Sequence, residues 1–172
     1  VLFRSRRAGF GEVEYDTSRP DSFAETRNSG ASLSLDWQTS ERWSQRLAVT
    51  ASPDHYLSHD NWSSEITTRR QSANWQNHLE IGGHSLLSGG VDYQDDRAVN
   101  QGNFDEVIVN RALYLQYQWG GKHVDLIAGV RSDDHSSFGE HTTGRLSIGG
   151  KIASGRLFAA HGSAFKAPTF NE

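Results

Sequence analysis

The sequence predicts an all-β protein, and more narrowly an antiparallel transmembrane β-barrel segment of about nine strands. Apolar and polar residues alternate with a period of two through most of the 172 residues, as in strands whose two faces meet different surroundings. No stretch repeats apolar residues at the spacing of an amphipathic helix. Short connections alternate with longer polar ones, as in barrels with tight turns at one end and long loops at the other.

Four hairpins account for most of the expected strands, and Gly82 and Gly83 are expected to supply positive φ in one of the turns. The strands are expected at residues 10–16, 31–38, 43–51, 65–81, 85–97, 109–119, 123–133, 142–152 and 156–165. Short turns are expected near residues 39–41, 82–84, 120–122 and 153–155, and longer polar connections near residues 17–28, 53–63, 99–107 and 134–141.

The two faces of these strands differ in polarity. Val124, Leu126 and Val130 fall on one face of their strand, whereas Asp125 and Arg131 fall on the other. The inward faces are also expected to carry Lys151 and His161. A dry soluble core cannot hold so many polar groups without partners, but a water-filled or plugged lumen tolerates them.

Composition narrows the class of protein. The hydrophobic fraction of 35% suits a soluble domain, but a barrel needs apolar residues only at alternate positions and so has a similar average. No run approaches the roughly 18 apolar residues of a spanning helix, and no apolar run follows the opening arginines as in a signal peptide. The chain has no Cys, which excludes disulfides and thiolate sites. Its 17 basic and 21 acidic residues are dispersed, so no nucleic-acid partner is expected.

Three tryptophans flank expected short turns: Trp37 and Trp43 at one turn and Trp119 at another. Indole rings favour the interface between membrane and water. We therefore expect these residues in the periplasmic aromatic girdle of a barrel that contacts outer-membrane lipid. The alternative is a core or interface role in a soluble β-protein.

An odd strand count leaves unpaired edges, which are not viable in lipid. Single-chain bacterial barrels close with an even number of strands. The sequence therefore favours either a closed barrel of eight strands or part of a larger barrel, and we expect the second.

Two stretches resemble the TonB-dependent outer-membrane receptors, and in particular their cobalamin receptor branch: RSDDHSSFGEHTTGRLSIGGKIASGRLFAAHGSAFKAPTFNE at residues 131–172 and ANWQNHLEIGGHSLLSGGVDYQDD at residues 73–96. The matching motif residues are Arg131, Asp133, Asp134, Phe165, Lys166, Ala167 and Pro168. The FKAP element is shared by siderophore and haem receptors, so the ligand is less well specified than the family.

The resemblance implies a bacterial outer-membrane protein with a 22-stranded barrel that is filled by a plug. Residues 1–172 would be a partial barrel domain that lacks the plug and the C-terminal strands. It also implies TonB-dependent import of cobalamin or a related corrinoid, with TonB acting through the plug. An iron chelate is the alternative ligand, bound by a siderophore or haem receptor.

The resemblance also suggests calcium as a possible cofactor, because cobalamin receptors bind calcium through acidic loop residues. The corresponding positions are Asp16, Asp54 and Asp60, and calcium prefers several hard oxygen ligands. This chain has fewer acidic positions in its first loop than such a site needs. Solvated loop aspartates are the alternative.

The RSDDHSS stretch places Arg131, Asp133, Asp134 and His135 at the top of one expected strand. This set suits either a metal or acid–base site or an ion-pair network at the rim or in the lumen, and we favour the network.

Ser163 lacks the G-x-S-x-G turn of a serine hydrolase. No enzymatic activity and no catalytic residue is expected. A small structural or adhesive barrel and a soluble partner-binding β-domain are the alternatives of another class.

Overall fold

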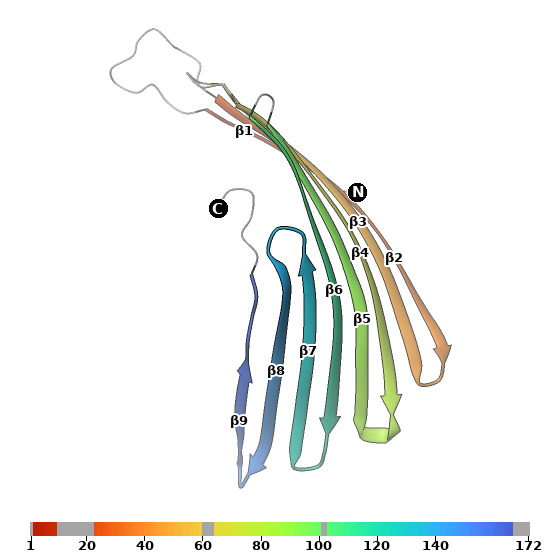
Figure 1. The fold of residues 1–172 in the computed structure, drawn as a ribbon. Helices are drawn as coiled ribbons and strands as arrows, with labels where there is room; N and C mark the ends of the chain where they lie inside the picture. The colour runs from red at the N-terminus through yellow and green to blue at the C-terminus, as the bar shows by residue number, and fades with distance from the viewer. Residues whose placement is uncertain (1, 10–22, 60–63, 101–102, 167–172) are drawn as a thin grey trace. The chain divides into compact units, whose positions relative to one another are not determined.

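The computed structural model describes residues 2–9, 23–59, 64–100 and 103–166. These residues form nine strands and one short 3-10 helix, in one sheet whose strand order follows the chain (Figure 1). The elements are β1 (Leu2–Gly9), β2 (Phe23–Ser40), β3 (Trp43–His59), β4 (Ser64–Ile81), η1 (Gly82–His84), β5 (Ser85–Asn100), β6 (Phe104–Gly120), β7 (Val124–His135), β8 (Gly139–Ile152) and β9 (Gly155–Gly162). The prediction of an all-β chain with about nine strands is confirmed. No helix in the described part of the chain is both long and apolar enough to cross a membrane.

Pairing is antiparallel between β1 and β2 and from β6 through β9. The described residues fall into two compact units. The first lies within Val1–Leu33, Val49–Ser72 and Asp95–Ile108, and the second within Ser34–Ala48, Ala73–Gln94 and Val109–Glu172. The second unit carries the short turns, β7 to β9 and the candidate site.

Several strands are longer than predicted. β3 continues to His59, β6 begins at Phe104 and β8 begins at Gly139, so the long connections expected at residues 53–63, 99–107 and 134–141 are mostly strand. The prediction of long loops at these positions was wrong because it relied on the alternation of apolar residues, which is weak there. Polar residues pair their backbones in a sheet as well as apolar residues do. The strand expected at residues 10–16 lies outside the described residues, and the first described strand is β1.

The turn between β4 and β5 is η1. Gly82 has a φ of +66°, which favours glycine. Gly83 does not have positive φ, contrary to the prediction, and negative φ is the ordinary value for a residue in 3-10 conformation.

The register from β6 to β9 defines an apolar face and a polar face of the sheet, since residues directly opposite each other share a face. The apolar face carries Leu113, Leu115, Tyr117, Trp119, Leu126, Ala128, Val130, Leu146, Ile148 and Leu157. The polar face carries Asn110, Tyr114, Gln116, Gln118, Asp125, Arg131, Asp133, Arg145, Ser147 and Lys151. Leu113 and Leu157 are 63% and 64% exposed, so the apolar face is open rather than packed into a core.

The prediction for His161 was wrong. It lies opposite Leu146 and therefore on the apolar face, whereas Lys151 lies on the polar face as expected. Alternation fails in β9 because Phe158 and Ala160 put apolar side chains on the polar face as well. The hydrophobic pattern of β9 therefore could not distinguish its two sides.

The tryptophans lie next to the short turns, as predicted. Trp119 is on the apolar face at the end of β6, Trp43 begins β3, and Trp37 is close to the end of β2. The Trp43 indole N–H donates to Asn77 Oδ1 at 3.1 Å, and Trp75 donates to Gln45 Oε1 at 3.0 Å. These bonds satisfy N–H groups that would be costly to leave unpaired in an apolar setting. The girdle role itself stays a prediction.

Candidate functional site

The candidate site is a groove of about 420 Å³ on the polar face of the second unit. Amides, hydroxyls and charged side chains dominate its lining. The side chains that line it from β4 to β8 and from the residue after β9 include Asn74, Gln76, Asp92, Tyr114, Gln116, Arg131, Thr143, Arg145 and Ser163. Leu115 and Val130 also line the groove. The polar side chains offer many directional hydrogen bonds, which suit contact with water, a polar ligand or another polar protein surface.

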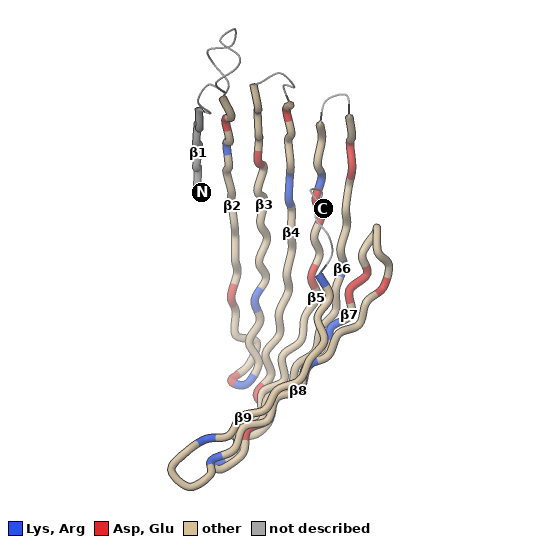
Figure 2. Tube along the Cα trace, turned by 90° about the vertical axis from the view of Figure 1, so that its left-hand side faces the viewer, with Lys and Arg blue, Asp and Glu red and all other residues tan. Residues whose placement is uncertain are grey.

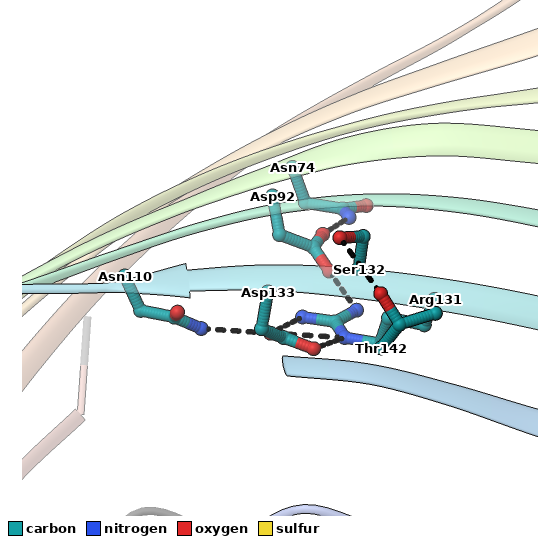
Figure 3. Close-up of polar contacts among 7 residues, drawn as sticks. All are labelled: Asn74, Asp92, Asn110, Arg131, Ser132, Asp133 and Thr142. Carbon is teal, nitrogen blue, oxygen red and sulfur yellow. Dashed lines mark hydrogen bonds and ion pairs between the residues drawn. The ribbon is translucent and has the colours of Figure 1, made fainter. Parts of the chain in front are cut away.

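Arg131 on β7 is the centre of the charged network in this groove (Figure 3). Its guanidinium donates to Asp133, with Nε at 2.9 Å from Oδ2 and the second contact from Nη2 at 3.0 Å from Oδ1. Its other nitrogen donates to Asp92 on β5, and Asn74 on β4 donates to the same carboxylate. One arginine thus links β7 with a strand two positions away in the sheet.

Asp133 is the most buried carboxylate of this network, with a side chain 9% exposed. Asn110 donates to its Oδ1 at 2.9 Å, in addition to the two contacts from Arg131. These hydrogen bonds satisfy a carboxylate that has little access to water.

Tyr114 on β6 crosses the neighbouring strand at a glycine. A Cβ placed on Gly90 would lie 2.6 Å from the Tyr114 hydroxyl and 2.3 Å from the Trp75 carbonyl oxygen. The tyrosine hydroxyl interacts beyond that strand with Asn74 and Gln76. Gly90 therefore leaves the space through which the phenol reaches the groove.

A second glycine, Gly149, also makes room for side chains that cross a strand on the polar face, closer to the short turns. Arg156 on β9 forms an ion pair with Asp125 on β7, although β8 lies between them. A Cβ on Gly149 of β8 would lie 3.0 Å from Arg156 Nη2 and 3.1 Å from Asp125 Oδ2. Glycine at this position lets the pair bridge over the strand.

An aromatic cluster joins the tip of the β7–β8 hairpin to the chain after β9. The Phe165 ring stacks on His141 with centroids 3.9 Å apart, and meets His135 edge-on at 6.4 Å. His135 also contacts Phe138 with centroids 5.0 Å apart. Close to this cluster, the Ser163 N–H donates to the Gly144 carbonyl oxygen at 2.9 Å, and the Gly144 N–H donates to Ser163 Oγ at 3.0 Å. The cluster fixes the path of the chain as it leaves β9.

Replacing Phe165 with Leu should release residues 163–166. Loss of the aromatic contacts should cost about 1 kcal/mol, seen as faster hydrogen exchange of the Ser163 amide in the full-length receptor. Phe158→Leu is the matched control, because Phe158 lies on β9 and is 59% exposed. Equal exchange rates at Ser163 in both variants would contradict the role given to Phe165.

The structure brings together some of the predicted motif residues and separates others. Arg131 and Asp133 form the predicted ion-pair network, but Asp134 lies opposite Glu140 on the other face and does not join it. Adjacent residues of a strand point to opposite sides, so Asp133 and Asp134 cannot share one network. Phe165 contacts the hairpin tip, Lys166 follows it, and Ala167 and Pro168 lie outside the described residues.

The calcium prediction is not tested. Asp16 and Asp60 lie outside the described residues, and Asp54 lies within β3 rather than in a loop. The Asp54 carboxylate is close enough to the Arg70 guanidinium to attract it electrostatically. Within the described ranges no group of three or more His, Asp or Glu side chains is placed to hold a metal ion.

Sequence reasoning missed Asp92, Asn74, Asn110 and Tyr114 as members of the site. The sequence offers one signal for Asp92: the alternation of polar and apolar residues assigns it to the polar face of β5. Its pairing with Arg131 joins positions 39 residues apart. Only the strand register and the reach of the arginine side chain determine that contact.

Comparison with known proteins identifies the family. The sequence profile of the TonB dependent receptor-like β-barrel matches residues 2–172, and the chain belongs to this family. The chain is 29% identical over 168 residues to the vitamin B12 transporter BtuB of Photobacterium profundum, covering 94% of this chain and 28% of that protein. It is 35% identical over 115 residues to BtuB of Vibrio vulnificus, covering 62% of this chain and 18% of that protein.

Solved structures show the same fold. The siderophore receptor PirA from Pseudomonas aeruginosa superposes with a TM-score of 0.55 at 16% identity, over 87% of this chain and 37% of that one. The ferric citrate transporter FecA in its unliganded form superposes with a TM-score of 0.60 at 12% identity, over 82% of this chain and 28% of that one. The chain thus corresponds to part of a receptor barrel in the bacterial outer membrane. In such a barrel the apolar face meets lipid and the polar face lines the lumen.

Proposed function

We propose that this chain forms part of the barrel wall of a receptor that takes cobalamin or a related corrinoid across the outer membrane. The observation that carries the proposal is the similarity to two vitamin B12 transporters, one of which aligns over 94% of the chain. The polar lumen groove supports it, since a wall rich in amides and hydroxyls suits the passage of a large polar ligand.

TonB dependence is part of the same proposal. Members of the family couple to TonB, and we assign that coupling here to a plug inside the lumen, to which the polar face would turn its groove. Arg131, Asp92 and Asp133 are bound to one another, so their role is to hold the wall rigid rather than to carry out chemistry. The proposed role is transport without catalysis.

A siderophore receptor is the second candidate, with an iron chelate as its ligand. The superposition on PirA and FecA fits this candidate, but likeness at 16% and 12% identity extends to the fold alone. The sequence similarity to the B12 transporters favours the corrinoid.

The test uses the full-length receptor that contains this segment. Purified receptor in detergent is titrated with cyanocobalamin and, in parallel, with a ferric siderophore, and binding is followed by equilibrium dialysis. We expect saturable binding of cyanocobalamin and none of the siderophore. Binding of the siderophore alone would overturn the corrinoid assignment.

A further inference from the structure

One arginine in the lumen groove has no ion-pair partner. Arg145 on β8 lines the groove of about 420 Å³ on the polar face, and its side chain is exposed. Arg131 and Arg156, which also lie on this face, are both bound to carboxylates. Within the described ranges the Arg145 guanidinium forms neither a hydrogen bond nor an ion pair. Its positive charge therefore stays open to the lumen.

Glycines flank Arg145 on both neighbouring strands. The register places it directly opposite Gly129 on β7 and Gly162 on β9. Gly129 does not have positive φ, and a Cβ built on it would have its nearest neighbour at 3.5 Å, an ordinary contact. Neither the backbone nor the packing therefore requires glycine at that position. Because no side chain stands on either side of Arg145, a ligand can reach its guanidinium.

The charge of the groove is also unbalanced. Its lining carries one carboxylate, Asp92, and two guanidinium groups, those of Arg131 and Arg145. Arg131 binds both Asp92 and the nearby Asp133, so these carboxylates are already neutralised. Leu146, the residue after Arg145, lies on the apolar face, which places the arginine at the depth of the membrane. An ionisable side chain that faces the interior at this depth commonly marks the path of a substrate.

We propose that Arg145 binds the phosphodiester of the corrinoid and is a specificity-determining residue of the receptor. This inference rests on the proposed function. A cobalamin carries amide groups around its ring and one anionic group, the phosphodiester that leads to its nucleotide. The groove offers the complementary groups, since the amides of Gln76 and Gln116 line it together with Arg145. A guanidinium can donate two parallel hydrogen bonds to a phosphate.

The test measures corrinoid binding by the full-length receptor in detergent, with equilibrium dialysis. The two ligands are cyanocobalamin and dicyanocobinamide, a corrinoid that lacks both the phosphodiester and the nucleotide. We expect Arg145→Gln to bind cyanocobalamin about tenfold more weakly than the unaltered receptor does, the loss of one charge-assisted contact. Binding of dicyanocobinamide should not change, because that ligand has no phosphate for the guanidinium to contact.

Lys151→Gln is the matched control. Lys151 lies on the same face of the same strand as Arg145 but does not line the groove. Its substitution removes an equal charge from the lumen wall. We therefore expect Lys151→Gln to bind both ligands as tightly as the unaltered receptor does.

The outcomes separate this inference from the proposed function. Equal affinity of Arg145→Gln and Lys151→Gln for cyanocobalamin would overturn the inference and leave the proposed function standing. An equal loss of affinity for both ligands in Arg145→Gln would also overturn it, because the arginine would then act through the wall or through a carboxylate of the plug. If the unaltered receptor does not bind cyanocobalamin, the proposed function is wrong, and this inference fails with it.

Discussion

Gly90→Ala should prevent the barrel wall from pairing correctly. The added Cβ would lie 2.3 Å from the Trp75 carbonyl oxygen and 2.6 Å from the Tyr114 hydroxyl. The tyrosine can move, but the carbonyl belongs to the backbone of the neighbouring strand and cannot. Relief requires β4 and β5 to shift apart, so we expect the free energy of unfolding to fall by about 3 kcal/mol. The measurement is denaturant unfolding of the full-length receptor in phospholipid vesicles, followed by tryptophan fluorescence.

The control for this substitution is Gly120→Ala. Gly120 ends β6, and a Cβ built there has no neighbour within 4 Å. Alanine is favoured slightly over glycine in a strand, so this variant should unfold at the same denaturant concentration as the unaltered receptor or a higher one. If Gly90→Ala and Gly120→Ala unfold at the same denaturant concentration, the lack of space beside Gly90 does not limit the packing of β4 against β5, and the prediction is wrong.

Arg131→Leu should cost about 2–3 kcal/mol of stability, because it leaves two carboxylates without their cation. The Asp133 side chain is 9% exposed and that of Asp92 is 27% exposed, so water compensates for little of the loss at Asp133. The value is below that of a fully buried pair because Arg131 itself is 37% exposed. Denaturant unfolding in vesicles measures this effect as well.

Two further variants distinguish the orphaned charge from a loss of packing. Adding Asp133→Asn to Arg131→Leu removes the uncompensated carboxylate and should recover about half of the lost stability. Arg97→Leu breaks the exposed ion pair between Arg97 and Asp105, which are 54% and 51% exposed, and should lower the stability by much less than Arg131→Leu does. If Arg131→Leu costs no more than Arg97→Leu, the network around Arg131 does not stabilise the wall.

Strand number and the apolar face of the central strands could be predicted because alternation is a local property. The strand expected at residues 65–81 is β4, Ser64–Ile81, within one residue. The strand ends were less predictable, since polar residues continue the sheet in β3, β6 and β8.

Figure 2 shows charged residues of both signs dispersed along the strands, which agrees with the dispersed charge seen in the sequence.

The candidate site was only partly predictable. Arg131 and Asp133 stood out in a motif, and alternation alone separates Asp133 from Asp134. Side-chain contacts between residues far apart in the sequence left no signal. These include Arg131 with Asp92, Tyr114 over Gly90, and Phe165 with His141.

The sequence by itself determined that this protein is a β-sheet with an apolar and a polar face, and it carried the motifs of its receptor family. Both properties rest on local periodicity and on short runs of residues, which are readable without knowing what lies beside them. The tertiary structure alone decided which polar side chains meet across the lumen wall. It also placed Asp134 and Glu140 beside Arg111 on the apolar face. Those outcomes depend on strand register, which shifts whole sets of neighbours and is fixed only when the strands pair.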